Sequence, residues 1–307
     1  MDDMISDYKC SVSKPDDFDE FWGNVLDEAA NIPLNPETVS LPLRSSDELE
    51  TFEISYDSLD GVRVAAWYCV PRDRQGPLPA VVLMPGYQSD PAIPKEWARM
   101  GYAAVTAAPR GKLRSNAQFN PGYPNLLTHN IIDRNTYSYR GFYVDAWRTI
   151  DYLLTRDEVD PDRIGVTGSS QGGGLTITTA AMRPEIKAAS AGAPYLCGYM
   201  DAIALTSSYP YQEINDYLKA HPDSRDDVER TLAYFDGISF ADRIQCPIIM
   251  NIGLQDNVCP PETGYALHNA IASSDKQLYA YDGHGHEAGR YKHTAITNEF
   301  FAKHLQP

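Results

Sequence analysis

The sequence contains no long apolar run and few basic residues, and these absences exclude several kinds of protein. A membrane-spanning helix needs about 18 consecutive apolar residues, and no such run occurs in the 307 residues. Basic residues number 26 against 42 acidic ones, which gives a net charge of −16. A nucleic-acid backbone or an anionic membrane is therefore not the expected partner, and a small neutral molecule fits this charge better.

Cysteine is also scarce, and its distribution predicts no cross-links. The five cysteines are odd in number and form no CxxC pair: Cys10, Cys69, Cys197, Cys246 and Cys259. This pattern favours reduced thiols over a disulfide framework or a zinc site, so we expect neither a metal nor another cofactor. The first residues, MDDMISDYKC, carry neither the basic nor the apolar region of a secretory signal. We therefore expect a cytoplasmic location.

Short apolar runs alternate with helical patterns along most of the chain. The runs cover 79–85, 102–109, 163–168, 188–194, 247–253 and 276–283, and the helical patterns cover 137–155, 172–183, 261–272 and 291–304. Such alternation predicts an α/β fold whose central sheet is mostly parallel and covered by helices on both faces. The run at 62–70 alternates in part and follows Asp60-Gly61, which is typical of an antiparallel strand leaving a turn.

The domain prediction is a single α/β domain over residues 1–307. Residues 15–30 place Phe18, Phe21, Trp22 and Val25 at helical spacing, so we expect an N-terminal helical extension within residues 1–35. Residues 198–243 interrupt the alternation with polar, tyrosine-rich helical stretches. We interpret them as a small cap-like insertion over the carboxyl edge of the sheet.

The stretch RIGVTGSSQGGG, residues 163–174, contains two adjacent serines between a β-rich run and a glycine cluster. Only Ser170 lies at the centre of a G-x-S-x-G pattern, with Gly168 and Gly172 two residues away. In that pattern a strained strand-to-helix turn exposes the serine as a nucleophile, and small neighbours let the turn close. A phosphate-binding loop is the alternative, but it would require a following Gly-Lys pair that is missing here. A dinucleotide-binding loop would lie in the first βα unit.

A nucleophilic serine needs a base and an acid, and two later loops supply them in the expected chain order. Asp256 lies just past the strand predicted at 247–253, and His286 follows the strand predicted at 276–283. His284 and Asp282 in the same loop are the alternative base and acid. The other histidines lie in predicted loops or helices and are expected to be surface or packing residues: His129, His221, His268, His293 and His304.

The predicted mechanism is acyl transfer through Ser170. His286 would take the serine proton, Asp256 would orient the imidazole, and water would hydrolyse the acyl-enzyme. The backbone N–H groups of Gln171 and Tyr87 are the expected oxyanion donors. Because the Tyr87 donor belongs to the main chain, we expect its ring to be free to shape the pocket.

Several long motifs resemble the acetyl xylan esterase and cephalosporin C deacetylase family, carbohydrate esterase family seven, within the α/β-hydrolase superfamily. They include DDFDEFW (16–22), YSYRGFYVDAWR (137–148), DRIGVTGSSQGGGLTI (162–177), PYQEINDYLKAHPD (210–223), GLQDNVCPP (253–261) and HEAG (286–289). The resemblance covers nearly the whole chain. It implies Ser170, Asp256 and His286 as the triad and Tyr87 and Gln171 as oxyanion donors. It also implies a homo-oligomer, specifically a hexamer.

One family signature departs from its usual form. The arginine-glycine-glutamine signature is present as Arg110-Gly111-Lys112, so a lysine replaces the glutamine. Arg110 is expected to be structural and to form ion pairs, and Lys112 is expected to reposition the loop or add a positive charge. The predicted function is removal of acetyl groups from acetylated sugars, xylo-oligosaccharides and similar small esters. The alternatives are an esterase or amidase with another small substrate, a prolyl-oligopeptidase-like peptidase, and a non-catalytic binding scaffold.

Overall fold

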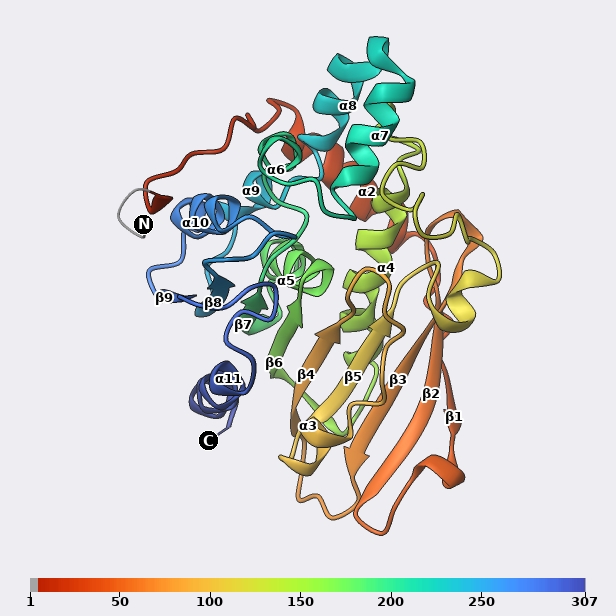
Figure 1. The fold of residues 1–307 in the computed structure, drawn as a ribbon. Helices are drawn as coiled ribbons and strands as arrows, with labels where there is room; N and C mark the ends of the chain where they lie inside the picture. Colours follow the sequence, from red (N-terminus) through yellow and green to blue (C-terminus); the bar gives the residue numbers. More distant parts are fainter. Residues whose placement is uncertain (1–4, 307) are drawn as a thin grey trace.

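A nine-stranded sheet runs through the computed structural model in the order β1-β2-β3-β5-β4-β6-β7-β8-β9 (Figure 1). The structure describes residues 5–306. The strands are β1 Glu37–Ser40, β2 Leu49–Asp57, β3 Arg63–Pro71, β4 Leu78–Met84, β5 Ala103–Ala108, β6 Val159–Ser169, β7 Ile186–Gly192, β8 Ile248–Gly253 and β9 Lys276–Tyr281. The first three pair antiparallel, β3 also pairs antiparallel with β5, and the other strands pair in parallel.

The predicted α/β architecture is confirmed, including the antiparallel strand that follows Asp60-Gly61. Each of the predicted strands is present, with ends that differ by a few residues. Strands β1 and β2 were not predicted from the sequence. Their residues, ETVS and LETFEISYD, carry polar and acidic side chains at most of the solvent-facing positions, so they lack the continuous apolar pattern of the buried strands.

Helices cover both faces of the sheet, and the side chains of β4 show how the two faces differ. Ala80, Val82 and Met84 belong to the main core, which contains side chains of α4 (Ser138–Leu153) and α5 (Gln171–Met182). Val81 and Leu83 point to the other face, in a smaller cluster with side chains of α3 (Lys95–Arg99) and α11 (Arg290–Leu305). This period of two explains why the strand is apolar throughout.

The remaining helices lie near the end of the sheet where the parallel strands finish (Figure 1). They are α2 Phe18–Ala30, α6 Tyr199–Leu205, α7 Gln212–Ala220, α8 Arg225–Leu232, α9 Gly237–Ala241 and α10 Pro261–Ala270. The described residues also form the short 3-10 turns η1 Pro42–Arg44, η2 Leu59–Gly61, η3 Leu113–Asn116 and η4 Pro222–Ser224. Trp22 fixes α2, because its indole N–H donates to the Tyr234 carbonyl at 2.9 Å and its ring packs on Trp147. Within residues 5–306, no helix is both long enough and apolar enough to cross a membrane.

Candidate active site

Ser170 lies at a sharp turn between β6 and α5. Its backbone has φ 60° and ψ −123°, a strained conformation for a residue with a side chain. The turn closes because Gly168 and Gly172 approach neighbouring backbone: a Cβ at Gly168 would lie 2.6 Å from the Gly172 carbonyl oxygen, and one at Gly172 would lie 2.3 Å from that of Met84. Ser170 N–H donates to the Gly192 carbonyl at 2.9 Å, which ties the turn to β7. The predicted strand, turn and helix around Ser170 are all present.

Ser170, His286 and Asp256 form a continuous hydrogen-bonded chain. The distance between Ser170 Oγ and His286 Nε2 is 3.0 Å, and the distance between His286 Nδ1 and Asp256 Oδ2 is 2.9 Å. The three residues follow β6, β8 and β9, whose carboxyl ends meet at the same edge of the sheet. With Nδ1–H donating to the carboxylate, the Nε2 lone pair faces the serine hydroxyl, which is the arrangement that proton removal requires.

The loops that carry Asp256 and His286 support each other. Asp256 is 6% exposed, and its Oδ1 accepts from the backbone N–H groups of Val258 and Cys259 at 2.8 and 2.9 Å. Asn251, at the end of β8, donates from its side-chain amide to the Ala288 carbonyl at 2.6 Å, and Gln255 N–H donates to the His284 carbonyl at 2.9 Å. These contacts fix the carboxylate and hold the histidine loop beside it.

The two alternative residues in the histidine loop have other partners. His284 Nδ1 lies 3.0 Å from Glu287 Oε1, and its ring packs against Tyr281. Asp282 is exposed, and its Oδ1 accepts from the Gln255 side-chain amide and from Gly283 N–H, each at 3.0 Å. Neither side chain forms a hydrogen bond with Ser170, so the geometry favours His286 and Asp256 over them.

Tyr87 lies in the loop after β4, beside the nucleophile turn, but its ring is not free as the sequence analysis expected. The Tyr87 hydroxyl donates to Glu213 Oε1 at 2.7 Å and accepts from Leu127 N–H at 3.1 Å, and the side chain is 6% exposed. Burial raises the pKa of the Glu213 carboxyl. Glu213 belongs to α7, so a residue far away in the sequence fixes this ring. No spacing or motif in the sequence singled out that contact.

Gln171 begins α5 with its backbone N–H at the first turn of the helix, next to Ser170. Its side chain is fully buried and is therefore not exposed to a bound substrate. The Tyr139 hydroxyl donates to Gln171 Oε1 at 2.7 Å, and Gln171 Nε2 donates to the Gly86 carbonyl at 3.3 Å. The Gln171 side chain therefore links the nucleophile turn to the Tyr87 loop.

Arg110 forms the predicted ion pairs, one with the buried Asp145 and one with the exposed Asp60. Its guanidinium binds Asp145 at 2.8 Å and Asp60 at 2.7 Å, and the residue is 3% exposed. Gly111 has φ 84°, a left-handed conformation that turns the chain after β5. The ion pair between Arg110 and Asp145 anchors the loop after β5 on α4, since Asp145 belongs to that helix.

The site does not favour a metal ion. Among the described residues, Asp256, Cys259 and His286 are the one group whose possible ligand atoms all lie within 4.8 Å of one another. Asp256 and His286 already bond to each other, however, and burial raises the pKa of the Cys259 thiol well above its usual range. The hydrogen bond between Asp256 and His286 is the arrangement that acid–base chemistry requires.

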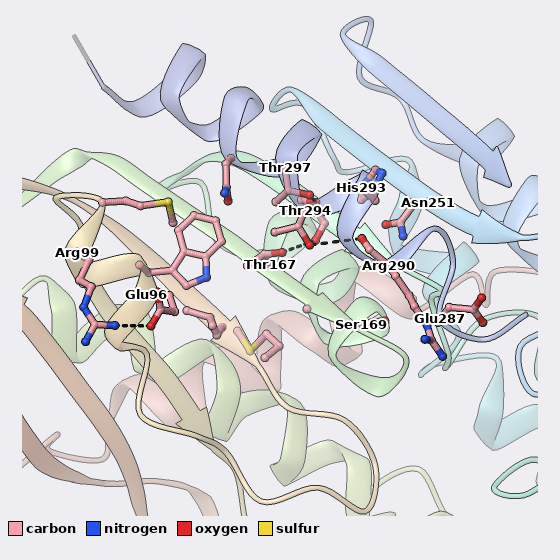
Figure 2. Close-up of a pocket in the computed structure, with 18 residues that line it drawn as sticks. Glu96, Arg99, Thr167, Ser169, Asn251, Glu287, Arg290, His293, Thr294 and Thr297 are labelled. Carbon is pink, nitrogen blue, oxygen red and sulfur yellow. Dashed lines mark hydrogen bonds and ion pairs between the residues drawn. The ribbon is translucent and has the colours of Figure 1, made fainter. Parts of the chain in front are cut away.

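A cavity of about 620 Å³ lies behind the nucleophile turn, between α3 and α11. Figure 2 shows Thr167 and Ser169 at its floor, Arg290, Thr294 and Thr297 along α11, and Glu96 with Arg99 on α3. Ser169 is exposed to this cavity, whereas Ser170 is not among its lining residues. The two adjacent serines therefore occupy different environments.

Comparisons with known proteins agree with this geometry. The sequence matches the acetyl xylan esterase (AXE1) family over residues 1–304. The structure superposes on an acetyl xylan esterase from Paenibacillus sp. R4 with a TM-score of 0.92 and 32% identity, covering 99% of both chains. A Pyrococcus horikoshii acylaminoacyl peptidase, 17% identical, aligns with a TM-score of 0.64 over 86% of this chain and 43% of the peptidase, which shows a shared fold alone.

A curated relative supports the same assignment. Acetyl esterase Axe7A from Xylanibacter ruminicola is 28% identical over 285 residues, which cover 87% of this chain and 62% of that protein. The aligned region thus spans less than two thirds of that relative's length. Because the family match extends over almost every residue and the Paenibacillus structure superposes end to end, the chain belongs to the acetyl xylan esterase (AXE1) family of serine hydrolases.

Proposed function

We propose that the protein is a carboxylesterase that removes acetyl groups from the hydroxyls of acetylated sugars, xylo-oligosaccharides and similar small esters. The observation that carries the proposal is the hydrogen-bonded chain from Ser170 Oγ through His286 to Asp256, in a member of this family. An amidase, or an esterase for another small substrate, would use the same residues, and substrate profiling distinguishes them.

In the proposed mechanism Ser170 Oγ attacks the ester carbonyl carbon while His286 Nε2 takes the hydroxyl proton. The carbonyl oxygen becomes an oxyanion that accepts from the N–H groups of Gln171 and Tyr87. When the C–O bond breaks, His286 returns the proton to the leaving sugar hydroxyl, and acetyl remains on Ser170. Water then attacks the acyl carbon with its proton going to His286, acetate leaves, and Ser170 is regenerated.

Several features support a small acyl group and a covering segment. The match to the acetyl xylan esterase family favours acetyl as the acyl group. Residues 198–243 reach the site through Glu213, which holds the Tyr87 ring, so we propose that they act as a cap. We also expect a cytoplasmic protein, which the five free cysteines favour. The family resemblance implies a homo-oligomer, specifically a hexamer, whose mass light scattering would measure.

Replacing the nucleophile gives the largest expected loss of activity. Ser170→Ala removes the attacking oxygen, so kcat for p-nitrophenyl acetate should fall by about 10⁴-fold or more. Ser169→Ala is the matched control, because Ser169 lies in the same turn but faces the cavity between α3 and α11. Its kcat should stay within about twofold of the native value. Equal activity of Ser170→Ala and the native enzyme would contradict the nucleophile assignment.

The substrate is tested by acyl-chain profiling on p-nitrophenyl esters, followed by acetylated xylo-oligosaccharides and cephalosporin C. We expect high kcat/KM on acetyl and a steep fall beyond butyryl, in line with the match to acetyl xylan esterases. A preference for long or aromatic acyl groups, or for amides, would overturn the acetyl assignment while leaving the triad intact.

A further inference from the structure

Lys112 is a buried cation that binds the loop carrying Tyr87. The residue is 1% exposed, and its Nζ donates to the Tyr87 carbonyl at 2.7 Å and to the Ser89 carbonyl at 3.0 Å. The ammonium also lies 5.2 Å from the centre of the Tyr123 ring. Lys112 therefore bridges two carbonyls of one loop, and one of them belongs to the residue whose N–H is the proposed oxyanion donor.

The loop that Lys112 binds has little support of its own. Within the described part of the chain, residues 86–92 make no main-chain to main-chain hydrogen bond. Side chains hold this loop instead: Lys112 binds Tyr87 and Ser89, Gln171 binds the Gly86 carbonyl, and the Trp67 indole binds the Pro91 carbonyl. The direction of the Tyr87 peptide thus depends on a few side chains, of which Lys112 is the charged one.

The charge on Lys112 is not neutralised in the way that the charge on Arg110 is. Arg110, two residues earlier, binds the carboxylates of Asp145 and Asp60. No ion pair of Lys112 exists among residues 5–306, and its polar partners are neutral carbonyl oxygens. Burying a cation without a carboxylate partner costs free energy, so a negative charge formed near Lys112 would be stabilised by it.

We propose that Lys112 is a positioning residue for the oxyanion hole: its ammonium clamps the carbonyls of Tyr87 and Ser89, and its charge stabilises the oxyanion formed beside that loop. The inference rests on the proposed function, because it takes the Tyr87 N–H as an oxyanion donor. In the resting enzyme Asp90 acts on Lys112 electrostatically without forming an ion pair, and the oxyanion adds a second negative charge. The favourable interaction is therefore stronger in the transition state than in the ground state, which is the condition for raising kcat.

The pH dependence of kcat gives a readout that a purely structural role would not move. Burial lowers the pKa of Lys112 to about 8, so the positive charge disappears as the pH rises through that value. The other titratable groups around the ammonium are Asp90 and Tyr123, and Glu213 faces Tyr123 and the Tyr87 hydroxyl. Burial raises the pKa of Tyr123 to about 12, so this phenol stays neutral while Lys112 titrates. The native enzyme should lose activity above about pH 8.

Three substitutions separate the charge from the hydrogen bonds. Lys112→Gln keeps a donor without the charge, so its kcat should be about 10-fold lower at pH 7, with no decline above pH 8. Lys112→Met keeps the length but has no donor, so a loss of about 10- to 100-fold in kcat is expected, with KM within about twofold. Lys112→Arg keeps the charge at all these pH values, so it should restore kcat relative to Lys112→Gln and shift the alkaline decline beyond pH 10.

Lys276→Gln is the matched control for losing a lysine that binds carbonyls. Lys276 Nζ donates to the carbonyls of His268, Asn269 and Ile271, at the amino end of β9 and the end of α10. Its removal should lower the melting temperature but leave both kcat and its alkaline decline at native values. Circular dichroism melting of every variant shows whether a loss of kcat accompanies a loss of folding.

The outcomes distinguish this inference from the proposed function. If Lys112→Gln has native kcat and the native alkaline decline, the positioning role is wrong, although loss of activity in Ser170→Ala would still support the esterase. If Ser170→Ala keeps its activity, the proposed function itself fails. If Lys112→Met does not fold, the pH profiles of kcat for Lys112→Gln and Lys112→Arg are compared with that of the native enzyme. Identical profiles in all three proteins overturn the charge effect. A decline above pH 8 in the native enzyme alone supports it.

Discussion

The two faces of the sheet are covered very differently. On one face α4 and α5 pack so closely that α5 places Gly172 against the backbone of β4, and the buried residues there form the main core. On the other face α3 has only five residues and α11 covers the rest, which leaves the cavity of about 620 Å³ between them. Helices therefore cover the α4 and α5 face closely, whereas the α3 and α11 face contains a cavity.

The difference indicates which side of the sheet holds Ser170, the proposed nucleophile. Main-chain hydrogen bonds of 2.9 to 3.1 Å hold Ser170 to Gly192 of β7, to Gly174 of α5 and to Tyr195. Ser169, one residue earlier, faces the cavity and is exposed. We therefore expect changes on the α4 and α5 face to affect catalysis strongly and changes on the α3 and α11 face to affect it weakly.

Among changes that test this contrast between the faces, the largest effect is expected at Gly172. In Gly172→Ala the new Cβ would lie 2.3 Å from the Met84 carbonyl oxygen, so α5 must move away from β4 and take the nucleophile turn with it. We expect kcat to fall by about 100-fold and the free energy of unfolding to fall by about 2–3 kcal/mol. Gly23→Ala is the control, since that helical glycine has open space around its Cβ position and should gain up to about 1 kcal/mol. Native kcat in Gly172→Ala would break the proposed contrast between the faces.

An intermediate effect is expected at His293, which is buried beside the cavity. Burial lowers the pKa of His293 to about 4, whereas an unfolded chain has a value of about 6.5. The unfolded state therefore binds more protons between these values, and the stabilisation present above pH 6.5 is lost as the pH falls toward 4. Between pH 7 and pH 5 the native protein should lose about 2 kcal/mol more than His293→Gln, measured by urea unfolding. Equal losses in both proteins would show that this side of the sheet does not bury the ring.

The smallest effect is expected at the floor of the cavity. Thr167 Oγ1 donates to the Ser190 carbonyl at 3.0 Å, but water can enter the cavity and replace that bond. Thr167→Val should therefore change the free energy of unfolding by less than about 0.5 kcal/mol and leave kcat unchanged. A loss of activity comparable with that of Gly172→Ala would show that the open face also positions Ser170.

The sequence predicted the buried strands and the three residues of the hydrogen-bonded chain, because both follow local rules. Apolar runs with turn residues between them mark strands, and Ser170, Asp256 and His286 each follow such a run in the expected order. The short helix α3 was missed because its five residues, KEWAR, follow a proline and are too few to show a period. The contacts of Tyr87 with Glu213 and of Lys112 with the Tyr87 loop join residues that are distant in sequence. They depend on how α7 and the loops pack, which no local pattern encodes.

The order in which the site is assembled makes ester hydrolysis a sensitive report on the completion of folding. The serine and the histidine are 116 positions apart, and the histidine and the aspartate are 30 apart, so the three groups meet only after β8 and β9 have paired beside β7. Helices such as α4 and α5 rely on local contacts and form sooner than long-range strand pairs. In a refolding experiment helical circular dichroism should therefore recover before esterase turnover, and the interval between the two signals would time the docking of the last strands.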